Sequence, residues 1–172
     1  NQPELSDDGS IVVFVSVSSD LVSLADVNGA SADIFVYDGS SLSAVTVKGS
    51  GTYTGRAGTL DGFAVSDTGE VVAFASSSPG LVADLNAISG NSQVYVRDLS
   101  NPLAPITERI SVDADSTYAD APAQTPSLSG DGRYVAFESY AGNLGSVANN
   151  GNWQVYVRDR SAATMTMISV DE

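Results

Sequence analysis

The sequence contains no cysteine and no histidine, and Lys48 is its single lysine among 172 residues. Without cysteine the chain can form no disulfide, no thiolate zinc site and no cysteine nucleophile. Without histidine it lacks the commonest general base and the commonest metal ligand. A serine nucleophile would have no histidine partner, and no Gly-x-Ser-x-Gly motif occurs. We therefore expect no catalytic residues and a protein that is not an enzyme.

Positive charge is also scarce, since six Arg and one Lys face 16 Asp and five Glu, for a formal net charge of −14. Nucleic acids and anionic membrane surfaces are bound through basic faces, so neither is an expected partner. No apolar run approaches the roughly 20 residues that span a bilayer, so we expect no direct membrane insertion. Few lysines with many Ser, Thr, Asn and Gly are typical of extracytoplasmic bacterial proteins, which predicts a periplasmic or secreted location.

One segment is repeated three times along the chain. Each copy contains a turn of the form Ser-x-(Asp/Thr)-Gly, then a β-rich run with a central Phe, and later an aromatic residue three positions before an Asp. The turn glycines Gly9, Gly69 and Gly132 are 60 and 63 residues apart. Self-similarity at such a period indicates stacked structural repeats.

Each copy is predicted to form four strands, because its apolar runs are short, β-branched or aromatic, and bounded by turn residues. In the third copy the expected strands are 126–130, 133–140, 153–159 and 164–170. No stretch has a sustained helical period. The expected fold is all-β, with three four-stranded antiparallel blades of a β-propeller. A β-solenoid or a β-sandwich is the structural alternative.

The predicted blades are residues 1–47, 61–113 and 125–172, which together form one repeat domain. A closed propeller has about 4–8 blades, so three blades leave two open ends. Either the chain is a piece of a larger propeller or copies assemble. In both cases the outward faces of the first and last blades are expected to expose apolar side chains, and a protein partner or a second copy is expected to cover them.

The pattern from Pro126 to Asp159 resembles the WD40-like repeat of TolB-type β-propellers, often called PD40. It reads Pro-x-x-Ser-x-Asp-Gly-x-x-Val-Ala-Phe-x-Ser followed by Val-Tyr-Val-Arg-Asp. The second copy departs from it at Phe63 and Thr68, and the first at Tyr37. The resemblance implies the fold but little about function, because propellers host many functions.

A meander topology predicts two rims. The hairpins 7–10, 67–70 and 130–133 should share one rim, and the loops 18–31, 78–91 and 141–152 should share the other with the linkers 48–61 and 113–125. Long loops on a rigid scaffold often bind ligands. The loop rim offers oxygen ligands for Ca²⁺, and the candidate metal ligands are Asp26, Asn28, Asp33, Asp84 and Asn86. Turns capped by these side chains are the alternative interpretation.

Four residues outside the repeat pattern are candidate partner-binding residues, since exposed aromatics and arginines often dominate interfaces: Tyr53, Arg56, Tyr118 and Trp153. Other polar residues have structural interpretations. Asp38, Asp98 and Asp159 are expected to cap the turns after the third strands, and the adjacent Arg97 and Arg158 to form ion pairs.

The sequence thus favours a non-catalytic scaffold or protein-binding propeller segment in an extracytoplasmic assembly. One alternative is a carbohydrate- or Ca²⁺-dependent ligand-binding propeller domain. Another is the propeller part of a larger hydrolase.

Overall fold

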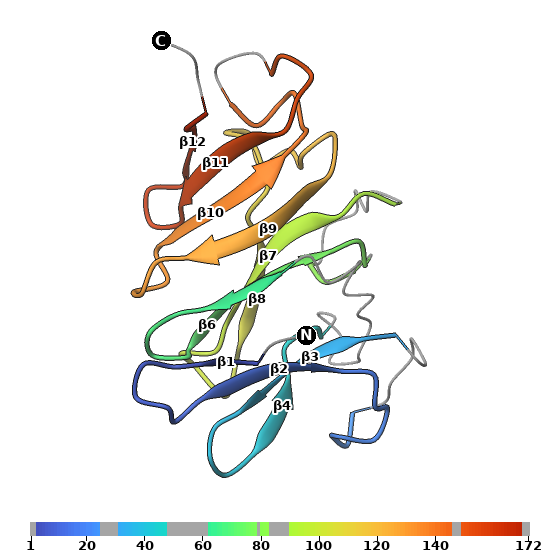
Figure 1. Ribbon diagram of the computed structural model, residues 1–172, viewed down its shortest axis with the longest axis vertical. Helices are drawn as coiled ribbons and strands as arrows, with labels where there is room; N and C mark the ends of the chain where they lie inside the picture. The colour runs from blue at the N-terminus through green and yellow to red at the C-terminus, as the bar shows by residue number, and fades with distance from the viewer. Residues whose placement is uncertain are drawn as a thin grey trace.

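The computed structural model describes residues 3–24, 31–47, 62–78, 80–82, 90–145 and 149–169. Within these ranges it is all-β, with three four-stranded sheets and no helix (Figure 1). The first sheet contains β1 (Glu4–Leu5), β2 (Val12–Ser16), β3 (Asp33–Tyr37) and β4 (Leu42–Ala44). The second contains β5 (Phe63–Val65), β6 (Val71–Ser76), β7 (Gln93–Asp98) and β8 (Ile106–Arg109). The third contains β9 (Ala123–Leu128), β10 (Tyr134–Ser139), β11 (Gln154–Asp159) and β12 (Thr164–Met167).

Every sheet is an antiparallel meander in which neighbouring strands follow one another in the sequence. The sheets correspond to the three predicted blades, and we call them blade 1, blade 2 and blade 3 in chain order. No helix of the described residues is long and apolar enough to cross a membrane.

The first strand of blade 3 begins earlier than expected, at Ala123 instead of residue 126. Its pairing with β10 shifts register between Ala136 and Glu138, so that Thr125 and Pro126 oppose the single residue Phe137. Two residues facing one define a β-bulge, and Thr125 has the unusual φ of 50°. Because β9 is an edge strand, Pro126 can lack an N–H there without breaking the sheet.

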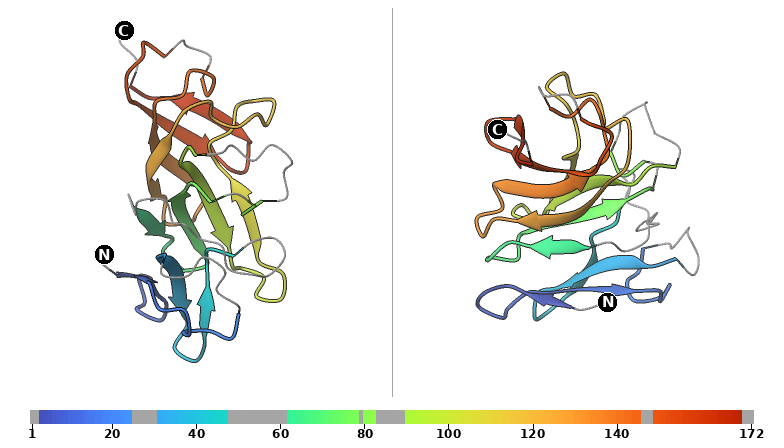
Figure 2. Two further views of the ribbon diagram at one scale, coloured as in Figure 1. Left: turned by 90° about the vertical axis from the view of Figure 1, so that its right-hand side faces the viewer. Right: turned by 45° about the horizontal axis from the view of Figure 1, so that its top comes forward.

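The blades stack face to face in chain order, with the chain termini at opposite ends of the stack (Figure 2). Strand alternation gives each blade two different faces. One carries the recurrent aromatics, as with Phe74 and Tyr95 in blade 2, and packs against the preceding blade. The other carries small and β-branched residues, such as Val94 and Val96, and packs against the following blade. We call these the aromatic face and the aliphatic face.

The recurrent aromatics form one stacked pair in each blade, as the repeat predicted. The ring centroids of Phe74 and Tyr95 lie 5.7 Å apart, and those of Phe137 and Tyr156 lie 5.9 Å apart. These four rings are buried between blades. The equivalent pair in blade 1, Phe14 and Phe35, has the same 5.7 Å separation, but Phe14 is only partly buried. The inter-blade core thus repeats at both blade junctions.

We expect Phe74→Ala to lower the free energy of unfolding by about 3–5 kcal/mol, the usual cost of removing a buried aromatic side chain. Phe74 is fully buried between blades 1 and 2, so the substitution leaves a cavity. Urea denaturation measures the loss. Leu103→Ala is the control, because Leu103 is 94% exposed and should change stability very little. A loss below about 1 kcal/mol for Phe74→Ala would show that this residue is not part of the core.

Candidate functional site

The surfaces between blades are built from contacts that recur at both junctions. The backbone N–H of Asp7 donates to the carbonyl of Asp67 at 2.9 Å, and the N–H of Asp67 donates to the carbonyl of Gly130 at 2.8 Å. These three residues hold the same position in the hairpin turn of their blades. A ladder of turn hydrogen bonds therefore runs through the stack, with each blade donating to the next.

The turn glycines make the second recurrent contact. A Cβ at Gly69 would lie 2.5 Å from the Ile11 side chain of blade 1, and one at Gly132 would lie 2.8 Å from Val71 of blade 2. Both glycines also have positive φ, of 74° and 69°. Only glycine allows the turn of one blade to lie so close to the aliphatic face of the blade before it.

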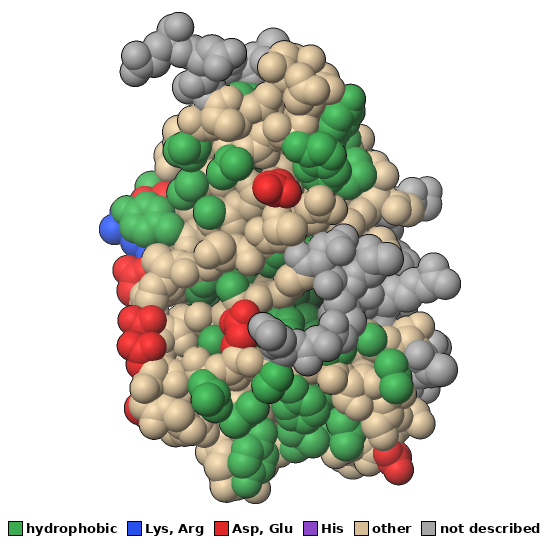
Figure 3. All heavy atoms as spheres, viewed as in Figure 1, with side chains coloured by type: hydrophobic (Ala, Val, Ile, Leu, Met, Phe, Trp, Pro, Cys, Tyr) green, Lys and Arg blue, Asp and Glu red, His purple; other side chains and the backbone are tan. Residues whose placement is uncertain are grey.

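Each end of the stack presents one half of these contacts. The end of blade 1 offers the Asp7 carbonyl, its aromatic face and Gly9. A Cβ added at Gly9 would lie in open space, with no atom of the described residues within 4 Å. That aromatic face includes Leu5, which is 60% exposed. Figure 3 shows hydrophobic side chains gathered at this lower end of the molecule.

The end of blade 3 offers the opposite half. The Gly130 N–H has no backbone acceptor among the described residues. Tyr134 holds the position of Ile11 and Val71 and is exposed, as are Val155 and Ile168 of the same face. The predicted exposure of apolar end faces is therefore confirmed for the part of the chain that the structure describes.

Solved structures share this fold of stacked four-stranded sheets. A putative TolB from Agrobacterium tumefaciens matches with a TM-score of 0.57 and 13% sequence identity, over 99% of this chain and 46% of that one. The tricorn protease matches with a TM-score of 0.55 and 12% identity, over 99% of this chain and 17% of that one. The β-propeller domain of the trilobed protease from Pyrococcus furiosus matches with a TM-score of 0.52 and 12% identity, over 96% of this chain and 40% of that one. The three sheets are propeller blades.

The chain spans less than half the length of each of these propeller structures. No family model matches the sequence, and neither does any curated protein. The similarity in three dimensions thus shows the propeller fold alone.

Of the predicted metal ligands, only Asp33 lies among the described residues; Asp26, Asn28, Asp84 and Asn86 lie outside them. Asp33 is 3% exposed, and its Oδ1 accepts a hydrogen bond of 2.7 Å from the Thr46 hydroxyl. Thr46 in turn accepts the N–H of Ile34 at 3.2 Å. No group of three or more Asp or Glu side chains in the described ranges is arranged to hold a metal ion.

The hydrogen bond between Asp33 and Thr46 has a counterpart in each of the other blades, where a glutamine amide replaces the carboxylate. In blade 2 the Ser111 hydroxyl donates to Gln93 Oε1 at 2.7 Å and accepts the N–H of Val94. In blade 3 the Ser169 hydroxyl donates to Gln154 in the same way. Each pair ties the start of the third strand to the end of the fourth. The position of Asp33 thus has a structural role in every blade.

Of the predicted partner-binding residues, Tyr53 and Arg56 lie outside the described residues. Tyr118 is half-buried, and the guanidinium of Arg109 lies 5.5 Å from its ring centroid. Trp153 is 45% exposed and meets Tyr140, also 45% exposed, in an edge-to-face pair with centroids 6.0 Å apart. Tyr140 was not among the predicted residues, because it directly follows β10 and no sequence spacing links it to Trp153.

The two predicted rims are present where the structure describes them. The Asp120 carboxylate accepts the N–H of Gly142 at 2.8 Å, and the Asn143 side chain donates to the carbonyl of Tyr118. These bonds join the linker 113–125 to the loop 141–152. Acidic side chains line the opposite, left-hand margin in Figure 3, where Figure 1 places the hairpins. The rim with the aromatic pair is thus separate from the acidic hairpin rim.

The carboxylates that follow the third strands cap turns, as predicted. Asp38 Oδ1 accepts the N–H groups of Ser40 and Ser41, and hydrogen bonds from the hydroxyl and N–H of Ser41 hold the pKa of Asp38 below its usual value. Asp98 and Asp159 accept equivalent bonds from the residues two positions later. Asp38 therefore stays ionised at neutral pH.

Within the described residues, the predicted ion pairs of Arg97 and Arg158 do not form. In the described residues, Asp159 pairs with Arg133 at 2.6 Å and Asp98 pairs with Arg160 at 3.0 Å. Arg97 donates instead to the Thr107 hydroxyl. In an extended strand, adjacent side chains point to opposite faces, so the neighbours in sequence do not meet.

Arg160 forms a polar cluster between blades 2 and 3. Its guanidinium donates to Asp98 at 3.0 Å, to Glu108 at 2.5 Å and to the Gly132 carbonyl at 2.7 Å. The Arg160 side chain is only 16% exposed. These interactions connect the third-to-fourth strand turn of blade 3 with the outer part of blade 2.

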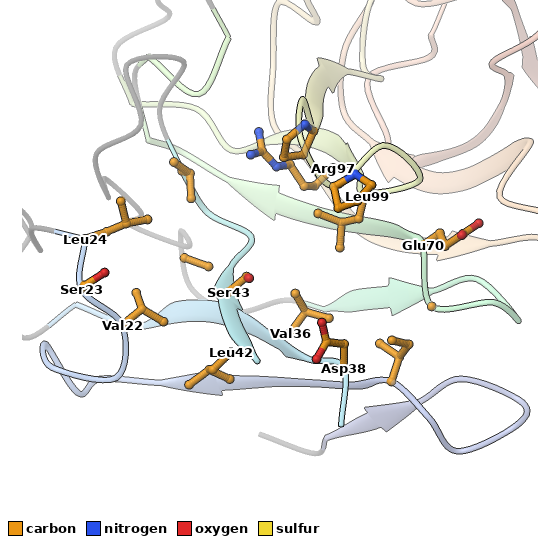
Figure 4. Close-up of a pocket in the computed structure, with 16 residues that line it drawn as sticks. Val22, Ser23, Leu24, Val36, Asp38, Leu42, Ser43, Glu70, Arg97 and Leu99 are labelled. Atoms are coloured by element: carbon orange, nitrogen blue, oxygen red, sulfur yellow. The ribbon is translucent and has the colours of Figure 1, made fainter. Parts of the chain in front are cut away.

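Within the described residues, the corresponding place between blades 1 and 2 is open. A cleft of about 510 Å³ lies there, which we call the β4 cleft (Figure 4). Its mainly apolar walls include Val36 and Leu42 of blade 1 and Leu99 of blade 2, and Asp38 and Glu70 add carboxylates. Leu99 follows Asp98 in blade 2 as Arg160 follows Asp159 in blade 3. The cleft is therefore the counterpart of the Arg160 cluster without its arginine.

We expect Arg160→Met to lower the free energy of unfolding by about 1–3 kcal/mol at pH 7. This is the range for hydrogen bonds to charged groups, and it is reduced here because Asp98 and Glu108 are partly exposed to solvent. Hydrogen bonds from Ser100 and Arg160, which outweigh desolvation, lower the pKa of Asp98. Stability from a carboxylate of lowered pKa is present above the unfolded pKa and disappears as pH falls through the folded pKa. The difference between the two proteins should therefore shrink below about pH 4.

Urea denaturation from pH 7 to pH 2.5 measures this difference. Arg133→Met is the matched control, because the Arg133 side chain is 43% exposed, against 16% for Arg160, and its ion pair with Asp159 should affect stability less. Equal losses for the two variants, or a loss for Arg160→Met that does not depend on pH, would contradict the assigned role of Arg160.

Proposed function

We propose that this chain is a non-catalytic scaffold or protein-binding segment of a TolB-type propeller built from PD40 repeats, working in an extracytoplasmic assembly. The supporting observation is that its two ends carry opposite halves of one blade junction. Its resemblance to PD40 repeats and its lysine-poor, cysteine-free composition support the family and the location.

A further blade fits each end face, because both inner junctions show how such a blade packs. A blade following blade 3 would accept the Gly130 N–H on its turn carbonyl and place its turn glycine against Tyr134. In a second copy of this chain, those groups are the Asp7 carbonyl and Gly9. Two copies joined head to tail at both ends give six blades, which lies within the usual range for a closed ring.

The energetics favour covering these faces. Burying a large apolar side chain contributes roughly 1.5–3 kcal/mol, and exposed residues of this kind at the two ends include Leu5, Val155 and Ile168. This burial at two junctions acts against the roughly 4–15 kcal/mol cost of association. Glu138 occupies the position held by Val15 and Ala75 in the other blades. This carboxylate favours a partner that offers a polar or cationic group at that point.

The purified chain should accordingly form a dimer, because both open faces are apolar and complementary. Light scattering at physiological salt measures its mass. Ile168→Glu should shift the chain towards monomer, because Ile168 lies on the open face of blade 3. Leu103→Glu makes the same change at an exposed turn residue outside the end faces and should leave the mass unchanged. A stable wild-type monomer that binds no apolar dye would contradict the proposed use of the end faces.

The Tyr140–Trp153 pair supports a second candidate function, carbohydrate binding at the loop rim. Both rings are exposed, and sugar rings stack on such aromatic surfaces. Amide groups lie close by, since Asn149 caps the loop by accepting the N–H groups of Gly151 and Asn152. By strand alternation Trp153 lies on the same side of blade 3 as Val155, so a sugar bound at this pair would lie next to the open end face.

Binding of an oligosaccharide should change the fluorescence of Trp153, the only tryptophan in the sequence. Titration with a panel of neutral oligosaccharides tests this, and Tyr140→Ala should weaken any binding by removing half of the stacking surface. Tyr37→Ala is the control, because Tyr37 is similarly exposed but belongs to blade 1. If none of the oligosaccharides gives a saturable change, or if Tyr140→Ala binds as well as the wild type, this second function is wrong.

A further inference from the structure

The β4 cleft has a template for its occupant within the same molecule. At the junction of blades 2 and 3, the equivalent space holds the Arg160 side chain, whose alkyl part lies between the blades and whose guanidinium reaches three acceptors. At the junction of blades 1 and 2, the equivalent residue is Leu99. Leucine supplies apolar surface but no donor, so this position offers no guanidinium to the acceptors of the junction.

Two of the three acceptors are retained at the β4 cleft. Asp38 holds the position of Asp98, and Gly69 holds that of Gly132, whose carbonyl accepts Arg160 Nη1. Asp38 and Gly69 both line the cleft. The third acceptor, Glu108, is replaced by Ser43, but Glu70 adds a carboxylate to the wall. Figure 4 shows Asp38 on the blade 1 side and Leu99 and Glu70 on the blade 2 side.

Asp38 has an unfilled acceptor position. Its Oδ1 accepts from Ser40 and Ser41, whereas its Oδ2 accepts, among the described residues, only the Ser41 hydroxyl, at 2.7 Å. A carboxylate oxygen can accept two hydrogen bonds. Oδ2 is also the oxygen through which Asp98 binds Arg160. The turn bonds of Asp38 therefore leave the oxygen needed for a guanidinium available.

We infer that the β4 cleft binds the side chain of an arginine from a protein partner. The apolar walls take the methylene groups, and the guanidinium pairs with Asp38 and Glu70 and donates to the Gly69 carbonyl. Arginine fits better than lysine because its planar fork presents several donors to separate acceptors. The cleft lies between blades 1 and 2, away from both end faces, so this site does not depend on the proposed end-face contacts.

Arg97, which also lines the cleft, does not exclude a second guanidinium. Its counterpart in blade 3 is Arg158, which shares a strand face with the buried Tyr156, so Arg158 and Arg160 coexist at the other junction. Arg97 is held by the Thr107 hydroxyl at 2.7 Å. Among the described lining residues, the two carboxylates of Asp38 and Glu70 outnumber the one cation, Arg97, so these walls carry a net negative charge. Binding of a carboxylate ligand through Arg97 would be the opposite result, and butyrate tests for it.

Butylguanidinium, an analogue of the arginine side chain, tests the site on the full chain. Methyl NMR spectra should show saturable shifts at Val36, Leu42 and Leu99. Butylammonium should bind more weakly, and butanol and butyrate should produce no comparable shifts. Asp38→Asn should weaken binding by roughly tenfold, because asparagine still caps the turn but loses the charge. Asp159→Asn is the matched control, since Asp159 caps the same turn in blade 3 outside the cleft, and it should bind normally.

Leu99→Arg provides an independent test, because it places the missing guanidinium within the chain. This variant should fold and should no longer bind butylguanidinium. Equal shifts with butanol would mean that the cleft recognises only apolar surface, and stronger binding of butyrate would mean that it selects anions. Either result, an absence of saturable shifts, or full binding by Asp38→Asn would overturn the inference. None of these outcomes would affect the mass of the chain in solution, which tests the end faces separately.

Discussion

The packing of an aromatic face against an aliphatic face is the interaction on which the rest of this structure depends. A four-stranded antiparallel sheet has two faces, and here both are largely apolar, so one blade cannot bury them alone. The stacked pair Phe74–Tyr95 covers the aliphatic face of blade 1, and Phe137–Tyr156 covers that of blade 2. Stability therefore arises between blades as much as within them, as is typical of repeat proteins.

This packing also fixes the direction of the stack. The turn N–H of one blade donates to the next blade, and the turn glycine of each blade lies against the aliphatic face before it. A blade consequently has a donating side and an accepting side. The two ends of the described stack differ for the same reason, and a complementary blade is the natural partner of each.

The sequence was sufficient to predict the strands and the inter-blade aromatics because these features recur in all three copies. Asp38, Asp98 and Asp159 were predicted as caps on the same basis, and the structure confirms it. Asp33 was harder to interpret, since its two counterparts are Gln93 and Gln154. All three residues have a side-chain carbonyl oxygen, and this shared feature could have predicted the hydrogen bond between Asp33 and Thr46.

Features found in only one copy could not be predicted in this way. Arg160 has Leu99 and Gly39 as counterparts, so no repeat pattern marked its cluster or the cleft that exists where it is missing. The early start of β9 depends on a bulge around Thr125, which the alternation of residues does not reveal. The Tyr140–Trp153 pair joins the ends of two strands, and only the register of β10 and β11 brings the two rings together.

Amide hydrogen exchange at Gly130 is the most direct test of the directional junction. The N–H groups of Asp7 and Asp67 donate within the stack and should be protected. If the end of blade 3 accepts a further blade from a second copy, the Gly130 N–H should become protected to a similar degree as protein concentration rises. Rapid exchange at Gly130 at every concentration, with Asp67 protected throughout, would show that the end face does not form the junction seen inside the stack.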